Sequence, residues 1–307
     1  MIYNIPMDEE LLGKIKKLVL PKPDSHKGQN GRLLIVGGSH LFHAASLWSL
    51  TVASRIVDLV HYSSVPENNA IVHELKKEFR NGIVVPREDI EEYVKEDNCI
   101  LIGPGMMRNE ASQISNFKFQ ISNLVELEKI TDEGIHTAAL TNYLLRKHKS
   151  KQWVIDAGAL QMLELENIPK NAILTPHHQE FETLKFRIQN SEFRISSQEL
   201  KIEEQVMQFA KKHNCIMLLK GKEDIASNGD ETRIIVGGNA GMTKGGTGDV
   251  LAGLIAALAC KNDPWVSTLA GSFINKKAGD ELYRKVGPFF NATDLANQIP
   301  ATMKELT

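Results

Sequence analysis

The chain has 307 residues, of which 42% are hydrophobic and 24% charged, with a formal net charge of −2. These values are typical of a globular protein and argue against nucleic acid or an anionic membrane as a partner. No apolar run reaches the roughly 20 residues of a membrane-spanning helix. Cys99, Cys215 and Cys260 lack metal-ligand spacing, so we expect reduced thiols in a cytoplasmic protein.

The first 60 residues predict a helix, a strand and a second helix. The N-terminus carries early acidic residues and no signal-peptide core, and it predicts a short amphipathic helix over 8–19. "RLLIVGG" (32–38) predicts a buried strand, and the stretch from Ala44 to Val60 predicts a helix.

The same alternation continues along the chain. Apolar strands that end in Gly, Pro, Asp or His are predicted at "CILIGPG" (99–105), "WVIDAGAL" (153–160), "AILTPHH" (172–178) and "CIMLLKG" (215–221). Helices are predicted between them, including 135–149 and 199–213. Such alternation indicates a parallel sheet covered on both faces, whose ligands bind beyond the carboxyl ends of the strands.

The rest of the chain predicts a hairpin and a helical end. The hairpin covers 224–238 with Asn228-Gly229 at its turn, and 247–301 is mostly helical. We expect a single domain over 1–307, with surface insertions near 115–123 and 185–197 that share alternating aromatic, basic and aliphatic residues. The acidic balance of the chain disfavours a nucleic-acid strip there.

"GNAGMTKGGTGDVLAGLIAAL" (238–258) is the richest motif. Its glycines expose backbone N–H groups, and the helix that begins near Thr247 points its positive dipole end at the same place, which predicts an anion site. It is not a P-loop. Asp249 in the first turn is expected to be held ionised by the dipole and to accept a proton from a hydroxyl that attacks a phosphate. The plainer alternative is a glycine turn with a capping Asp.

Two more strand ends carry polar residues. "LTPHHQEF" (174–181) supplies His177, His178 and Glu180, which alone would fit a solvated helix start. Adjacent histidines do not have zinc spacing on a helix. Lys220 and Gly221 end another strand, where an ammonium and bare backbone suit a nucleotide or, equally, a plain turn.

The order of these motifs resembles the NAD(P)H-hydrate dehydratases of the ribokinase-like superfamily. The series is "HKGQNGRLLIVGGSHLFHAA", "LIGPG", "VIDAGAL", "ILTPHHQEF", "LLKGKED" and the glycine-rich motif, over roughly residues 27–258. The resemblance implies an α/β, three-layer sandwich with a mostly parallel central sheet and helices on both faces.

The resemblance also implies a reaction. Such enzymes are lyases that repair hydrated NADH and NADPH, (6S)-NADHX and NADPHX. ADP or ATP phosphorylates the 6-hydroxyl, and phosphate then leaves to restore the reduced dinucleotide, with AMP or ADP released. Magnesium would bridge phosphate oxygens rather than sit in a protein cage. The donor stays open, with ADP favoured, and so does the oligomeric state, for which a homo-oligomer is one expectation.

The family pattern assigns roles to residues at matching positions. Asp249 would be the base, and Gly246, Thr247 and Gly248 the anion hole. The dinucleotide contacts would be Ala45, Gly105, Asp156, His177, Glu180 and Phe181, with Asp249. The adenine-nucleotide contacts would be Lys220, Gly221, Lys222, Glu223 and Asp224, with Gly248.

Some positions depart from the family pattern. Ala44-Ala45 replaces a frequent Gly-Ala, Met106 and Met107 follow Gly105 in place of Leu-Gly, and Gly158 replaces a second acid. These changes concern substrate contacts more than phosphoryl transfer. Two alternatives remain: a ribokinase-like vitamin or sugar kinase, and a nucleotide-binding module without turnover. No fused epimerase is expected ahead of residue 27.

Overall fold

The computed structural model describes residues 9–109, 121–189 and 200–307. Nine strands form one sheet in the order β3-β2-β1-β4-β5-β6-β7-β8-β9. The strands are β1 (Arg32–Val36), β2 (Leu59–Ser63), β3 (Ile83–Val84), β4 (Cys99–Ile102), β5 (Gln152–Ile155), β6 (Ile173–Leu174), β7 (Ile216–Leu219), β8 (Asp224–Ser227) and β9 (Thr232–Ile235). The first seven pair in parallel, and β8 and β9 pair antiparallel at one edge.

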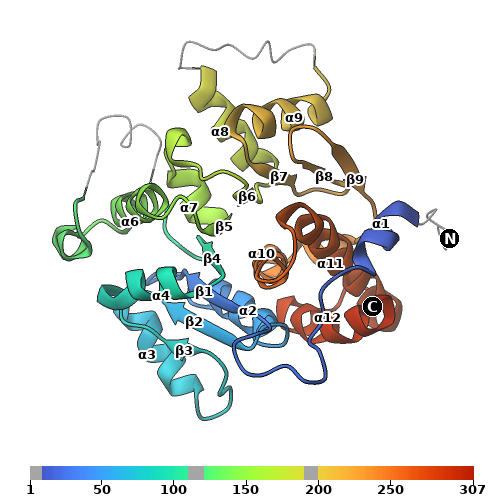
Figure 1. Cartoon of the computed structure of the whole chain (residues 1–307), viewed down its shortest axis with the longest axis horizontal. Helices are drawn as coiled ribbons and strands as arrows, with labels where there is room; N and C mark the ends of the chain where they lie inside the picture. The colour runs from blue at the N-terminus through green and yellow to red at the C-terminus, as the bar shows by residue number, and fades with distance from the viewer. Residues whose placement is uncertain (1–8, 110–120, 190–199) are drawn as a thin grey trace.

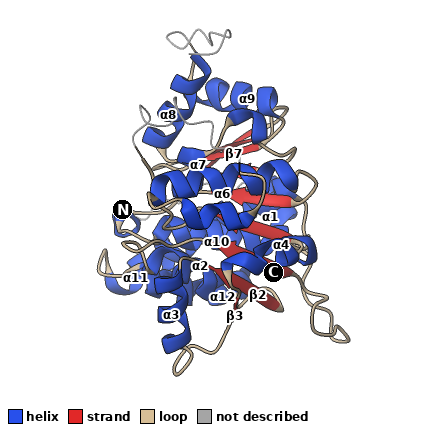
Figure 2. Ribbon diagram, turned by 90° about the vertical axis from the view of Figure 1, so that its left-hand side faces the viewer, coloured by secondary structure: helices blue, strands red, loops and turns tan. Residues whose placement is uncertain are grey.

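The strands run through the middle of the molecule with helices on either side (Figure 2). Side chains of β1 alternate between two cores: Leu33 and Ile35 pack on one face of the sheet, and Leu34 and Val36 on the other. One face carries α1 (Glu9–Ile15), α2 (Ala44–Ala53), α3 (Pro66–Leu75), α10 (Thr247–Ala259), α11 (Pro264–Val286) and α12 (Ala292–Leu306). The other carries α4 (Ile90–Glu96), α6 (Glu133–Lys147), α7 (Ala157–Met162), α8 (His178–Gln189) and α9 (Ile202–His213). This is the predicted α/β three-layer arrangement.

Helix α10 occupies the centre of its layer, next to α2 and α11 (Figure 1). Every residue from Val250 to Ala259 is buried, so its side chains pack all round rather than along one stripe. Gly253 lets α2 approach closely, because a Cβ there would lie 2.6 Å from Ser49 Cα. The Ser49 hydroxyl donates to the Asp249 carbonyl oxygen at 2.7 Å. The first turn of α10 is therefore fastened to α2.

One boundary expectation is wrong. The helix expected from Ala44 to Val60 ends at Ala53, and β2 begins at Leu59. The stretch from Ala44 to Val60 contains no Gly or Pro to mark a break. Asp58 accepts hydrogen bonds from the N–H groups of Gly28 and Asn30, which fixes a turn before the strand. The hairpin with its turn at Asn228-Gly229 is confirmed as β8–β9.

Most of the two expected insertions lies outside the described residues. Of the parts described, Ile121 is buried in the core and Lys185–Gln189 belong to α8. The N-terminal helix covers 9–15 of the expected 8–19. Within the described ranges, no helix has the length and apolar character needed to cross a membrane.

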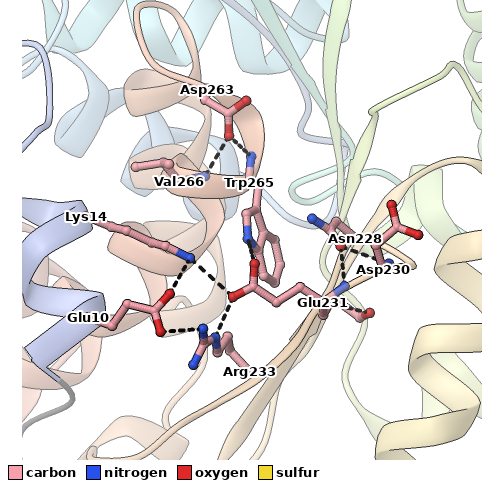
Figure 3. A network of polar contacts seen from close by, with 10 residues as sticks. Glu10, Lys14, Asn228, Asp230, Glu231, Arg233, Asp263, Trp265 and Val266 are labelled. Carbon is pink, nitrogen blue, oxygen red and sulfur yellow. Dashed lines mark hydrogen bonds and ion pairs between the residues drawn. The ribbon is translucent and has the colours of Figure 1, made fainter.

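A polar network joins α1 to the hairpin and to α11 (Figure 3). Glu231 lies at its centre and contacts Lys14 at 3.2 Å and Arg233 at 2.6 Å. The indole N–H of Trp265 donates to the other Glu231 oxygen at 3.1 Å, and Glu10 pairs with Arg233 at 2.6 Å. The network holds the edge of the sheet whose strands lead into the site described next.

Candidate active site

The carboxyl ends of β5, β6 and β7 bring three distant segments together. Asp156 follows β5, is 2% exposed, and accepts hydrogen bonds on Oδ1 from Thr175 Oγ1 at 2.7 Å and Lys220 Nζ at 2.8 Å. His177 and Lys220 form an isolated parallel bridge that continues the pairing of their strands. Burial opposes the charge of Lys220, but the carboxylates of Asp156 and Glu180 outweigh it and raise the Lys220 pKa.

Glu180 is a buried carboxylate in the first turn of α8. It accepts hydrogen bonds from the backbone N–H of His177 and from the amide of Gln161, both at 2.9 Å. The His177 side chain is 46% exposed and lies beside Glu180. The structure thus brings the predicted residues His177 and Glu180 to the same strand ends as Asp156 and Lys220.

Asp249 lies in the first turn of α10, with its position set by Ser49. Burial, followed by the negative charge of Asp156, raises its pKa to about 7, although Lys220 acts in the opposite direction. The expectation that the helix dipole holds Asp249 ionised is therefore wrong. A dipole contributes modestly at a helix end, and here desolvation and a second carboxylate exceed it.

The turn before α10 presents backbone donors. Gly246 has φ of +96°, and a Cβ there would overlap the Trp48 ring, so this glycine is required by the turn and by packing. Within the described residues, the N–H groups of Gly246 and Gly248 have no hydrogen-bond partner. The Thr247 N–H lies 3.5 Å from the Lys244 carbonyl oxygen, and the Thr247 hydroxyl donates to Met242 and Lys244.

A cleft of about 580 Å³ opens beside this turn, within the size range of small-molecule sites. Its lining combines charged, glycine and apolar residues. They are Lys220, Gly221, Lys222, Asp224, Gly237, Gly238, Asn239, Ala240, Met242, Thr243, Thr247, Gly248, Leu251, Asn275 and Lys276. At one end, a Cβ on Gly248 would lie 3.6 Å from Lys220 Nζ, so ammonium and helix terminus meet there.

The predicted nucleotide segment 220–224 forms one wall of the cleft. The Gly221 N–H donates to Asp224 Oδ1 at 2.9 Å, and Ser272 donates to Asp224 Oδ2 at 2.7 Å. Glu223 is exposed and does not line the cleft.

Helix α11 contributes residues that sequence reasoning missed. Lys276 is 5% exposed and reaches the carbonyl oxygens of Gly221 and Lys222 at 3.1 Å and Asp224 Oδ1 at 3.2 Å. Asp280 accepts from the N–H of Gly238 at 3.1 Å. In the sequence, "NKKAGDE" (275–281) is typical of a solvated helix face, and no local pattern indicates that Lys276 is buried.

Two expected dinucleotide contacts are neighbours, and one lies apart. Gly105 adopts φ of +72°, and a Cβ there would lie 3.0 Å from Ala45 Cβ, so the loop after β4 touches the start of α2. Phe181 is fully buried and packs against Phe209 with ring centroids 5.9 Å apart. Its side chain supports α8 from the core.

The sequence profile of the NAD(P)H-hydrate dehydratases matches residues 33–301. The chain belongs to this family. It is 34% identical over 313 residues to a bifunctional NAD(P)H-hydrate repair enzyme from Methanocaldococcus jannaschii, covering 98% of this chain and 54% of that protein. It is 33% identical over 288 residues to the ADP-dependent (S)-NAD(P)H-hydrate dehydratase of Nitrosopumilus maritimus, covering 92% of each. The chain spans about half the length of the bifunctional relatives.

Solved structures share the fold. An Enterococcus faecalis protein of the ribokinase-like superfamily superposes with a TM-score of 0.72 at 23% identity, covering 96% of this chain and 95% of that one. A Bacillus subtilis ADP/ATP-dependent NAD(P)H-hydrate dehydratase, co-crystallised with ATP and Mg²⁺, gives 0.69 at 20% identity and covers 97% of both chains. The predicted ribokinase-like fold is confirmed.

Two departures from the dehydratase pattern are linked in the structure. A Cβ on Gly158 would overlap the carbonyl of Met106 and lie 3.0 Å from Met106 Cβ. An acid at position 158 would therefore not fit beside this Met106 backbone. In this dehydratase-family chain, the glycine at position 158 and the Met106 backbone after Gly105 pack directly against each other, so the two departures depend on one another.

Proposed function

We propose that this protein is an ADP-dependent dehydratase that converts the S epimers of hydrated NADH and NADPH to the reduced dinucleotides. The observation that carries the proposal is the position of Asp249 in the first turn of α10, beside a nucleotide-sized cleft. The charges of Asp156 and Lys220 act on its pKa there. The names of relatives that align over 92% of this chain support the same activity.

In the proposed reaction, Asp249 removes the proton of the 6-hydroxyl. A pKa of about 7 suits a general base that works near neutral pH, because about half of the Asp249 carboxyl groups are ionised there and the carboxylate is still basic. The hydroxyl oxygen attacks the terminal phosphorus of ADP, and the bond from that phosphorus to the AMP oxygen breaks.

The proposed anion hole is formed by the turn before α10. The free N–H groups of Gly246 and Gly248 are preorganised donors for the phosphoryl group in transfer, and Lys220 adds a positive charge next to Gly248. Phosphate then leaves C6 with the C–O bonding pair while the adjacent ring carbon loses a proton, and the ring double bond forms again. Phosphorylation helps because hydroxide is a poor leaving group.

Magnesium fits this proposal as a companion of the nucleotide. Among the described residues, no group of three or more His, Cys, Asp or Glu side chains converges into a cage. Asp224 is already engaged by Ser272, Lys276 and a backbone N–H. When bound, the ion would neutralise phosphate charge, and the residues of the chain would position the phosphates around it.

The proposal also covers the residues that bind the two substrates and the place where the protein works. Ala45, Gly105, His177 and Glu180 bind the hydrated dinucleotide on the α2 and α8 side of Asp249. Lys220, Gly221, Lys222 and Asp224, which line the cleft, bind the adenine nucleotide. The protein works in the cytoplasm as one domain over 1–307.

The deciding assay combines the purified protein with hydrated NADH, magnesium and ADP or ATP. We expect the near-ultraviolet absorbance of NADH to return together with an equal amount of inorganic phosphate. No return with either nucleotide would refute the activity. A stable phosphorylated alcohol without elimination would instead establish the kinase alternative.

A further inference from the structure

One buried acceptor in the cleft has no partner. Asn275 on α11 is 4% exposed and lines the cleft, and its Oδ1 accepts no hydrogen bond within the described part of the chain. Buried polar atoms are nearly always paired, since an unpaired one loses its water without compensation. An orphaned acceptor at a cleft wall therefore suggests a ligand that donates.

The neighbours of Asn275 place it along the apolar part of the cleft. Gly271 and Gly279 lie four residues to either side, on the same face of α11. A Cβ on Gly271 would press on Ile255 of α10, and one on Gly279 would overlap Met242. Asn275 thus faces the space between α10 and Met242, where Leu251 also lines the cleft.

Two of the lysines that line the cleft already have partners. The next residue, Lys276, contacts the carbonyl oxygens of Gly221, Lys222 and Gly237 as well as Asp224. Lys220, at the phosphate end, contacts Asp156. Lys222 also lines the cleft but is exposed, whereas Asn275 is buried. An apolar wall with one amide suits an aromatic ring with polar edges.

The geometry points to Asn275 as the residue that selects adenine, by accepting a hydrogen bond from the exocyclic 6-amino group of the nucleotide. This inference rests on the proposed function, since it takes the cleft as the ADP site. An asparagine amide matches adenine because its oxygen accepts from the amino group and its NH₂ donates to a ring nitrogen. With Oδ1 facing position 6, a 6-oxo base places its carbonyl oxygen against this acceptor, which leaves both oxygens unpaired.

The test is calorimetric titration of the wild-type protein with ADP, purine riboside 5′-diphosphate, IDP and GDP. Purine riboside diphosphate lacks only the 6-amino group. We expect it to bind about tenfold more weakly than ADP, and IDP and GDP more weakly still. Equal affinity for ADP and the amino-free analogue would overturn the inference while leaving nucleotide binding intact. Absence of binding by every diphosphate would refute the nucleotide site itself.

Replacing Asn275 completes a double-mutant cycle between this residue and the 6-amino group of the nucleotide. Asn275→Leu keeps the branched side-chain shape but removes the amide, so ADP affinity should fall about tenfold to that of the amino-free analogue, whose own affinity should hardly change. Thr243→Val is the matched control, because Thr243 also lines the cleft but donates its hydroxyl to the Ala240 carbonyl. The control should keep the ratio between the two nucleotides. An unchanged ratio in Asn275→Leu would overturn the assignment.

Discussion

The ammonium of Lys220 lies 2.8 Å from Asp156 Oδ1, and these two charges act on the pKa of Asp249 in opposite directions. Asp156 raises that pKa and Lys220 lowers it, while burial adds the largest upward contribution. The basicity of Asp249 is therefore set mainly by burial and adjusted by two residues at the ends of β5 and β7.

Replacing Asp249 tests its proposed role as the base. Asp249→Asn should reduce turnover of hydrated NADH by about 10²- to 10⁴-fold, because an amide does not accept the hydroxyl proton. Calorimetric affinity for ADP should stay within a few-fold, which serves as the folding control. Undiminished turnover would remove Asp249 from the mechanism.

The pH dependence of kcat/KM reports the ionisation of the same group. Since a base acts when deprotonated, we expect kcat/KM to rise with pH through a midpoint of about 7. Asp156→Asn removes the negative neighbour and should move this midpoint to lower pH. Thr175→Val removes only a hydrogen bond to Asp156 and should move it less. A midpoint unchanged by Asp156→Asn would contradict this account.

The glycines before α10 should differ sharply in their tolerance of substitution. Gly246→Ala places a Cβ at φ of +96° against Trp48, and should lower the free energy of unfolding by roughly 2–4 kcal/mol. Gly245 has open space around its position, so Gly245→Ala should change it by less than about 0.5 kcal/mol. Urea denaturation of both variants measures the difference. Equal effects would show that the ring contact is unimportant.

The network around Glu231 should stabilise the fold in a pH-dependent way. Burial opposes its ionisation, but Arg233, Lys14 and Trp265 outweigh this and lower the pKa below 4.5. Its contribution is therefore present above pH 4.5 and is lost as the pH falls through the lowered value. Glu231→Gln should cost about 1–2 kcal/mol of unfolding free energy at pH 7.

The control for that measurement is Glu74→Gln. Glu74 pairs with Lys77, but both side chains are more than three-quarters exposed, so we expect a change below about 0.5 kcal/mol. The difference between wild type and Glu231→Gln should shrink as the pH is lowered past 4.5. A difference that persists in acid would show that packing, rather than charge, is lost.

Local patterns predicted those parts of the fold that local chemistry determines. The strand at 32–38 and the hairpin around Asn228 follow from apolar runs and turn residues, and the structure confirms both. The boundary between α2 and β2 was wrong because no Gly or Pro interrupts the stretch from Ala44 to Val60, and the turn depends on contacts of Asp58 with residues 28 and 30.

The candidate site also contains residues that local motifs predict and residues that they do not. Asp249, Lys220 and Glu180 could be named because motifs surround them. Lys276 and Asn275 could not, because their burial depends on packing against segments far away in the sequence. The raised pKa of Asp249 was missed for a similar reason, since Asp156 is brought beside it only by the sheet.

The contact between Ser49 and Asp249 couples α2, on the dinucleotide side of the site, to α10, which carries the proposed base. Ala45, expected to touch the dinucleotide, is one turn away from Ser49 on α2, and Asp249 begins α10. Gly253 brings the two backbones close together at Ser49, and the Ser49 hydroxyl bonds to the main chain of Asp249. We therefore expect a dinucleotide that displaces α2 to displace the first turn of α10 with it, so that the spacing between the substrate hydroxyl and the Asp249 carboxylate is kept.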